Sequence, residues 1–244
     1  MAFWFRRKQS TRPKPSLIRR LLRRFWMFLL LLVVGDALYL AWIWPDWDDY
    51  RAGPVQASQF IRDYERDADR FADWPPLRWK PVSIDRIPEH LIRAVIVAED
   101  ARFYQHGGVD WIALKEAMQY NLAQKRLAYG ASTLSQQTTK NLFLTPSRDL
   151  LRKWHELILT LAMERNLSKR RILEVYLNVA QFGKGIYGVD AAARHYWDVP
   201  VSNITAPESI ELAATLPSPV SNNPASNTQA FRNRVSKIRR FYYR

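Results

Sequence analysis

Apolar residues recur every three or four positions along most of the chain beyond residue 57, which is the pattern of amphipathic helices. This spacing predicts helices over residues 58–74, 90–104, 109–126, 145–166, 168–180, 189–197, 205–216 and 231–244. The alternation typical of a strand occurs only in WKPVSI, residues 79–84, and the glycine-rich FGKGIYG, residues 182–188, predicts a turn. We therefore expect a mainly α fold.

The longest apolar run is residues 25–44, which contain a single ionisable side chain, Asp36. As a helix, these residues would rise about 30 Å, the thickness of the hydrocarbon core of a bilayer. Nine Lys or Arg residues and no acid precede the run, and tryptophans flank both of its ends. A cleaved signal peptide is the alternative, but bulky residues follow the run where a cleavage site needs small ones. The pattern predicts a single-pass membrane anchor with its N-terminus in the cytoplasm.

The formal net charge of +14 is concentrated beside this anchor. Without residues 1–24, the chain carries 28 basic and 23 acidic residues, so the remainder is only weakly basic. This distribution argues against nucleic acid as a partner. We expect four parts: a basic cytoplasmic segment (1–24), a transmembrane helix (25–44), a linker with a juxtamembrane helix (45–78) and one folded domain (79–244) large enough to carry an active site.

Two adjacent carboxylates, Glu99 and Asp100, follow the apolar stretch AVIVA at 94–98. In a continuous helix, Glu99 shares a stripe with the apolar residues before it and with Phe103 and His106, whereas Asp100 is turned about a quarter of the circumference away. Desolvation on such a stripe raises the pKa of a carboxyl group toward the range useful for proton transfer. An ordinary acid at a helix end is the alternative, and periodicity alone slightly favours it.

Two further clusters carry polar side chains suited to anions and sugars. GASTLSQQTTKN, residues 130–141, is dense in hydroxyl, amide and amine donors and has no acid, although a solvated loop would have the same composition. RKWHE, residues 152–156, places Glu156 four residues after Arg152, which is also the spacing of an exposed helix salt bridge. No nucleotide-binding glycine loop, zinc-site histidine spacing or penicillin-binding serine motif occurs in the sequence.

Five blocks occur in order: E-D-x-x-F-x-x-H-x-G from Glu99, G-x-S-T-x-x-Q-Q-x-x-K-N from Gly130, R-K-x-x-E from Arg152, K-R-R-I-L-E-x-Y-L-N from Lys169 and G-x-Y-G-V-x-A-A-A from Gly185. Together they resemble the signature blocks of the peptidoglycan glycosyltransferases, glycosyltransferase family 51, over about residues 80–220. With one span and no transpeptidase motif, the chain is similar to the monofunctional, biosynthetic members found in Gram-negative bacteria. One departure is Trp197-Asp198, where the family usually has an aromatic residue followed by glycine.

The resemblance implies a lysozyme-like, two-lobed α fold with one lobe against the membrane, in a protein of the bacterial inner membrane whose catalytic domain is periplasmic. It implies a hexosyltransferase that polymerises lipid II into glycan strands for cell wall biogenesis and cell shape. The undecaprenyl-diphosphate-linked chain would be transferred, with inversion, to the 4-hydroxyl of the acceptor's N-acetylglucosamine. The implied partners are lipid II, the growing chain, the membrane and other wall-synthesis and division proteins.

The resemblance also implies roles for individual residues. Glu99 would be the general base, and Lys140, Arg148 and Arg152 would neutralise the departing diphosphate. Glu156 would assist by orienting these cations, by holding Mg²⁺ or Mn²⁺, or by stabilising the oxocarbenium, and the motifs do not choose among these roles. No organic cofactor is implied. The other matched residues are expected to bind substrate: Asp100, Phe103, His106, Ser132, Thr133, Gln136, Gln137, Asn141 and Lys153.

Two other functions, and two interpretations of an apolar segment, stay open. A lysozyme-like lytic enzyme acting on finished glycan would also use two carboxylates, but it has no diphosphate to stabilise and little use for the cations. A non-catalytic membrane scaffold of wall synthesis would leave Glu99, Lys140 and Glu156 freely replaceable. The apolar residues Trp111, Ile112, Leu114 and Met118 could contact the membrane or the prenyl chain, and ordinary core packing explains them equally well.

Overall fold

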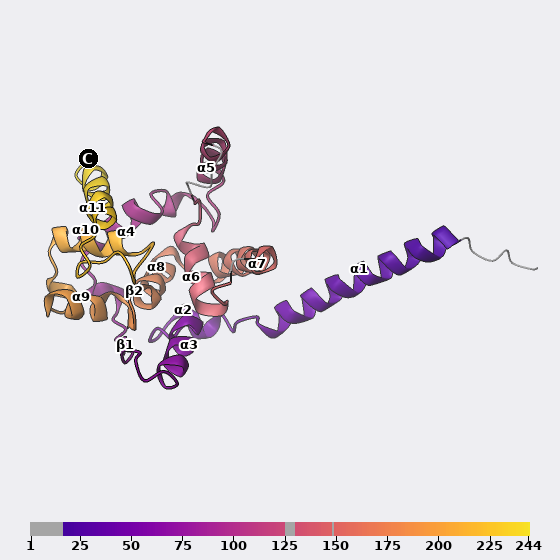
Figure 1. Ribbon diagram of the computed structural model, residues 1–244, viewed down its shortest axis with the longest axis horizontal. Coiled ribbons are helices and arrows are strands. Elements are labelled where there is room, and N and C mark those ends of the chain that lie inside the picture. The colour runs from indigo at the N-terminus through magenta and orange to yellow at the C-terminus, as the bar shows by residue number, and fades with distance from the viewer. Residues whose placement is uncertain (1–16, 125–129, 148) are drawn as a thin grey trace, which may run out of the picture. The chain divides into compact units, whose positions relative to one another are not determined.

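The computed structural model describes residues 17–124, 130–147 and 149–244. The chain divides into two compact units, one ending at Trp44 and the other comprising Pro45–Arg244. The described part of the first unit is α1 (Leu17–Trp42), an uninterrupted helix with a mean hydropathy of 2.0 in its most apolar window and no buried residue (Figure 1). Its 26 residues rise about 39 Å, which is long enough to cross a bilayer. The helix begins before residue 25, where the apolar run starts, because leucine and arginine are good helix formers.

The second unit is mainly helical. Its helices are α2 (Asp48–Arg51), α3 (Gln59–Ala68), α4 (Glu89–Glu99), α5 (Trp111–Ala123), α6 (Leu134–Phe143), α7 (Leu150–Asn166), α8 (Lys169–Val179), α9 (Val189–Trp197), α10 (Ala206–Thr215) and α11 (Gln229–Tyr242), with 3₁₀ turns η1 (Ile84–Arg86), η2 (Phe103–Gln105) and η3 (Val201–Asn203). The strands β1 (Arg78–Trp79), β2 (Gln181–Gly183) and β3 (Ile186–Tyr187) form a sheet in the order β1-β3-β2. The mainly α fold is confirmed.

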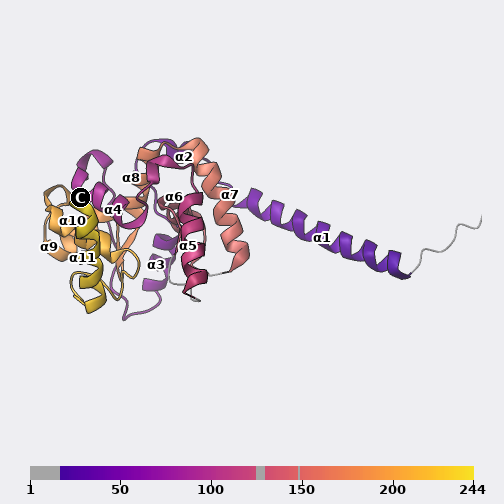
Figure 2. The ribbon, with the colours of Figure 1, turned by 90° about the horizontal axis from the view of Figure 1, so that it is seen from above.

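The core is built around α8, in which eight of the eleven residues are buried. Helices α6 and α8 pack against each other, α7 packs on α6, and α4 packs on α10 and α11. Figures 1 and 2 place α9, α10 and α11 on one side of α8, and α5 and α7 on the other. Helix α5 has no buried residue, so it stands off from this core. Residues 45–78, predicted as linker and juxtamembrane helix, contribute the buried Trp47, Ile61 and Tyr64 to the same unit.

Helix α6 lies in a segment where the sequence pattern predicted no helix. Its buried face is polar: Ser135 bonds Glu164, the Thr138 hydroxyl donates to the Leu134 carbonyl at 2.8 Å, and Thr139 contacts the Met163 sulfur. Because hydroxyl groups that bond α7 or the helix's own backbone occupy most of this face, it shows no apolar periodicity in the sequence.

Several predicted element ends are wrong. The helix expected over 90–104 stops at Glu99, since Asp100 is extended with φ −160° and the chain re-enters helix only as the 3₁₀ turn η2. The helix expected from Thr145 begins at Leu150, where the Asp149 side chain caps the amide of Arg152. The turn predicted in the glycine-rich stretch is present at Lys184–Gly185, where it joins β2 to β3, two strands that were not predicted. The strand predicted at 79–84 is reduced to β1.

The departure at Asp198 coincides with an unusual backbone conformation. Asp198 follows the last residue of α9 with φ 56° and ψ 29°, the left-handed conformation that glycine adopts most readily at a helix C-terminus. Aspartate is one of the few other residues that tolerate it. The end of α9 therefore has the backbone conformation that suits the glycine usual at this position, but the residue that adopts it is an aspartate, for which the conformation is strained.

Candidate active site

Glu99 closes α4 and faces the interior. Its side chain is only 11% exposed, and burial raises the pKa of its carboxyl above the usual range. The positive charge of Arg234 and the hydrogen bond from Gln137 oppose this rise, and the charge of Asp100 adds to it. The site therefore holds a carboxyl group whose affinity for a proton is increased by its surroundings.

Helices α6 and α11 fix the Glu99 carboxylate from two sides. The Gln137 side-chain amide donates to Oε2 of Glu99 at 2.9 Å, and Arg234 Nη2 donates to Oε1 at 2.6 Å. Gln137 is itself held by the buried hydroxyl of Tyr176, which donates to its Oε1 at 3.2 Å. Gln137 was predicted from the second block, whereas Arg234 was not. The only feature of the sequence that could have indicated Arg234 is its helical spacing from the apolar residues of the basic tail.

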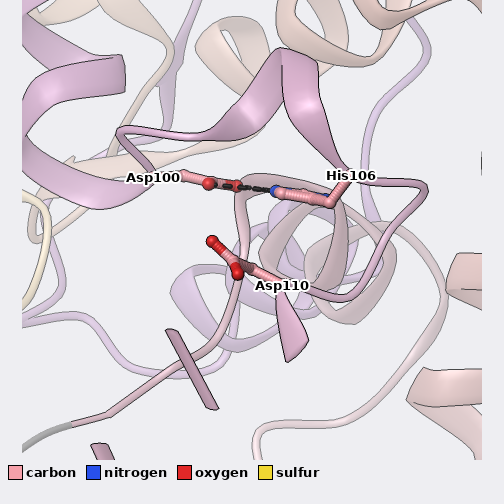
Figure 3. A group of neighbouring side chains, drawn as sticks. All are labelled: Asp100, His106 and Asp110. Atoms are coloured by element: carbon pink, nitrogen blue, oxygen red, sulfur yellow. Dashed lines mark hydrogen bonds and ion pairs between the residues drawn. The ribbon is translucent and has the colours of Figure 1, made fainter. Parts of the chain in front are cut away.

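Asp100, the residue after Glu99, forms a buried pair with His106, and Figure 3 shows the two side chains pointing toward each other. Both carboxylate oxygens of Asp100 lie 3.0 Å from Nε2 of His106, and Oδ2 also accepts from the Leu134 amide at 3.0 Å, at the start of α6. Nδ1 of His106 accepts from the Gly108 amide at 3.2 Å, which places the ring proton on Nε2. Asp100 therefore ties the end of α4 to the start of α6 and to the loop after η2.

Asp110 lies on the other side of this cluster and caps α5. Its Oδ1 accepts from the amides of Ile112 and Ala113, and Arg102 Nε donates to Oδ2 at 2.8 Å. Burial pushes the pKa of Asp110 up, but the bonds from Arg102 and Ala113 outweigh burial and hold the pKa below its usual range.

Ligand atoms of Asp100, His106 and Asp110 lie within 4.8 Å of one another, a grouping that resembles a cation site. Every carboxylate oxygen in it already accepts a hydrogen bond, and the ring nitrogen facing Asp100 carries a proton. In this arrangement the three residues form a hydrogen-bond network that joins the end of α4 to the starts of α5 and α6.

Phe103 and the N-terminal cap of α6 are buried residues of the fold around the site. Phe103 is fully buried, with Lys169 Nζ 4.3 Å from the centre of its ring. Thr133 accepts from the Gln136 amide, Gln136 Oε1 accepts from the Thr133 amide in return, and the Thr133 hydroxyl donates to the Gly108 carbonyl at 2.6 Å. Phe103, Thr133 and Gln136 thus shape the fold around Glu99, and their predicted contact with substrate stays a prediction.

The second predicted acid, Glu156, is buried on α7 between two cations. Arg152 Nη1 donates to its Oε2 at 2.6 Å, and Lys153 binds its Oε1. Lys153 Nζ also donates to the exposed Ser132 hydroxyl at 3.3 Å. Nε of Arg152 is buried and finds no acceptor within the described ranges. The pairs are thus not the exposed salt bridge that the spacing alone would allow.

A cleft of about 340 Å³ opens beside Glu99. Glu99 and Asp100 line one part of it, and Gly130 to Thr133 line another. Among these lining residues, Ser132 accepts the hydrogen bond from Lys153, the partner of Glu156. A second cavity of about 460 Å³, between η1, α9 and η3, contains none of the predicted site residues.

The remaining predicted residues lie farther along α6 and α7. Lys140 is half-buried, with Nζ 5.9 Å from the centre of the Phe60 ring, and Asn141 is half-buried beside it in the sequence. Arg148 lies outside the described residues.

Known proteins resemble the chain over most of its length. Residues 70–241 match the model of the family described as Transglycosylase. The biosynthetic peptidoglycan transglycosylase of Nitrosomonas eutropha is 42% identical over 211 residues, covering 86% of this chain and 85% of that protein. The protein of the same name from Rhodospirillum centenum is 42% identical over 228 residues, 92% of each chain. That from Bordetella pertussis is 36% identical over 241 residues, 93% of this chain and 96% of its own.

Proposed function

Because the chain belongs to the transglycosylase family and is a peptidoglycan glycosyltransferase, we propose that it polymerises lipid II into glycan strands. The 4-hydroxyl of the acceptor's N-acetylglucosamine attacks the anomeric carbon of the donor chain, with inversion. As the new glycosidic bond forms, the bond between the anomeric carbon and the diphosphate oxygen breaks, and undecaprenyl diphosphate leaves. The observation that supports this proposal most directly is that one cleft is lined by both the buried Glu99 and Ser132, whose hydroxyl accepts a hydrogen bond from Lys153.

Glu99 acts as the general base. Its carboxylate takes the proton of the attacking hydroxyl, and its raised pKa brings it closer to the pH at which such transfer is efficient. Each of its oxygens accepts one hydrogen bond from the described side chains, and a carboxylate oxygen has two lone pairs, so capacity remains for the acceptor hydroxyl. The partners hold the group in one orientation before substrate arrives.

The departing diphosphate is stabilised by cations on α6 and α7. Arg152 has a buried Nε donor without an acceptor in the described ranges, and Lys153 binds the Ser132 hydroxyl that lines the cleft. Lys140 and Arg148 complete the proposed set. Such preorganised donors stabilise the charge that develops on the leaving group.

Among the roles open to Glu156, the contacts favour orientation of these cations. Arg152 binds one of its oxygens and Lys153 binds the other, so the carboxylate fixes the positions of both cations. A requirement for Mg²⁺ or Mn²⁺ stays a prediction.

Apolar surface around the site suits a lipid substrate. On α5, Trp111 and Ile112 are 66% and 59% exposed, and at the start of α7 Leu150 is 90% exposed. We place these side chains against the bilayer or the prenyl chain, with α1 as the anchor of an inner-membrane protein and residues 45–244 in the periplasm. Leu114, from the same predicted set, is half-buried.

The proposal is tested by polymerisation of purified lipid II by the full chain in detergent. Wild type is expected to make polymer, and Glu99→Gln to lose about 10²–10⁴-fold of the rate. Glu89→Gln, which removes an exposed acid from the start of the same helix, is the control and should match wild type. Polymerisation by Glu99→Gln near the wild-type rate would refute the base. Release of muropeptides from sacculi by wild type, without polymer from lipid II, would support the lytic alternative.

A further inference from the structure

Arg234 is the one residue of the basic C-terminal helix that reaches the proposed base. It follows the buried Phe231 by three positions and precedes the buried Ile238 by four, so it lies on the face of α11 that packs on α4. Arg239 and Arg240 lie on the exposed part of the same helix. The placement of Arg234 follows from helical geometry rather than from the general basicity of the tail.

The contact between Arg234 and Glu99 is close and shielded. Nη2 of Arg234 lies 2.6 Å from Oε1 of Glu99 and 3.5 Å from the Ala98 carbonyl, and the side chains are 31% and 11% exposed. Charge-assisted hydrogen bonds of this length are among the stronger ones in proteins. A cation–π contact between Arg93 on α4 and the Tyr242 ring, at 4.9 Å, joins the same two helices farther along.

Few other charges act on Glu99. Asp100 follows it, Tyr176 faces it from α8 through Gln137, and Arg102, Asp110 and Glu116 line the cleft with it. Arg102 is itself paired with Asp110 and Glu116, so it contributes little net positive charge. Within the described residues, Arg234 is the cation that bonds Glu99 directly.

We propose that Arg234 is a positioning residue of the transferase reaction, which keeps Glu99 ionised in its buried setting and holds its carboxylate in one orientation. A carboxyl group buried without a counter-charge takes up a proton, and a protonated Glu99 cannot accept one from the acceptor hydroxyl. Helix α11, which lies outside the five blocks, thereby belongs to the catalytic machinery. The inference rests on the proposed role of Glu99 as the base.

The first experiment measures the rate of lipid II polymerisation between pH 5 and 9 for wild type, Arg234→Gln, Arg234→Lys and Arg240→Gln. The rate requires ionised Glu99, so it falls as the pH drops through the pKa of that group. Arg234→Gln removes an influence that lowers this pKa, and the acid limb is expected to move up by about one pH unit or more, so the rate on the acid side of the limb should fall about tenfold or more and recover at higher pH. Arg234→Lys retains the charge and should stay closer to wild type. Arg240→Gln removes an exposed charge from the same helix and should leave the profile unchanged.

A uniform loss of rate in Arg234→Gln, with the limb unmoved, would show a merely structural role and overturn the proposal, as would an unchanged profile. Infrared difference titration of Glu99, with Glu99→Gln as the blank, gives a readout that needs no substrate. Glu99 should titrate at higher pH in Arg234→Gln than in wild type, and titration at the same pH would overturn the proposal.

If wild type makes no polymer, the proposed function fails, and this titration alone decides whether Arg234 sets the charge of Glu99. If Arg234→Gln does not fold, Arg234→Lys decides: a wild-type limb together with a wild-type titration supports the charge role, and a limb that moves despite the retained charge contradicts it.

Discussion

The side-chain amide of Gln137 donates to Oε2 of Glu99 at 2.9 Å, and through this bond α6 holds the last residue of α4. The two residues belong to different sequence blocks and lie 38 positions apart. Tyr176 on α8 in turn fixes the amide by donating to its oxygen. The carboxylate is therefore oriented through a relay of side chains from two other helices.

Replacing Gln137 should lower the rate more than the stability. In Gln137→Ala the Glu99 carboxylate loses one of its two bonds, and we expect kcat for lipid II polymerisation to fall about 10- to 100-fold because the base is misplaced. Tyr176→Phe should have a smaller effect, since Gln137 still reaches Glu99. Gln56→Ala, at an exposed glutamine, serves as the control. A wild-type kcat in Gln137→Ala would show that the bond does not position the base.

The charge of Glu99 should make the stability of the protein depend on pH in a definite direction. Because burial raises its pKa in the folded state above the unfolded value, its contribution to the unfolding free energy is fully present below the unfolded pKa and is lost as pH rises through the folded pKa. Each unit of the rise corresponds to about 1.4 kcal/mol. Glu99→Gln resembles the protonated form and lacks this loss.

Thermal unfolding of wild type and Glu99→Gln between pH 4 and 8 measures this effect, since the other titrating groups are common to both. The melting temperature of Glu99→Gln is expected to gain on that of wild type as pH increases. A constant difference across this range would contradict the raised pKa.

The sequence predicted the parts of the fold in which apolar periodicity and burial coincide. The membrane-length helix and the helices that became α8, α9 and α10 follow directly from spacing and capping residues. Helix α6 does not, because most of its buried residues are polar, and Ser135 and Thr139 bond side chains of α7, partners that they find only in the folded protein. The end of α4 was placed too late, since nothing in the sequence indicates that Asp100 turns inward to bond His106 and the start of α6.

Part of the site was likewise beyond the sequence. Periodicity placed Glu99 among apolar residues, and the structure finds it buried. Arg234 lies 135 residues away, in a stretch with several other basic residues, and only its spacing from Phe231 and Ile238 separates it from them. The blocks also named Phe103 and Thr133, and the structure finds both buried, a state that the motifs do not indicate.

Arg171, in the fourth block, should be a stability residue rather than a catalytic one. Its buried guanidinium donates to the carbonyls of Tyr50 and Gly53 at 2.7 and 3.0 Å and pairs with Glu174 at 2.7 Å. It thereby fastens the chain near residue 50 to the core helix α8. In Arg171→Met, Glu174 and the carbonyls lose this partner, and we expect a loss of about 3–5 kcal/mol of unfolding free energy.

The neighbouring residue provides the control for this prediction. Arg170 forms an exposed pair with Asp85, and Arg170→Met should change the stability by less than about 1 kcal/mol. Thermal unfolding of the full chain in detergent compares the two variants, and limited proteolysis should cut near residues 50–56 sooner in Arg171→Met. Equal stability of the two variants would show that the bonds to Tyr50 and Gly53 contribute little.

Asp198 should tolerate glycine and reject a β-branched residue. Its φ of 56° lies in the left-handed region, where the side chain of an ordinary residue crowds the backbone. Asp198→Gly relieves this crowding but loses more chain entropy on folding, so we expect a change between zero and about +1 kcal/mol in unfolding free energy. Asp198→Val should lose about 1–2 kcal/mol, since valine pays the full cost of this conformation. Asp73→Val is the matched control, because Asp73 is also exposed but has no positive φ. Thermal unfolding measures all three variants, and an equal loss in the two valine variants would mean that the helix end is not strained at Asp198.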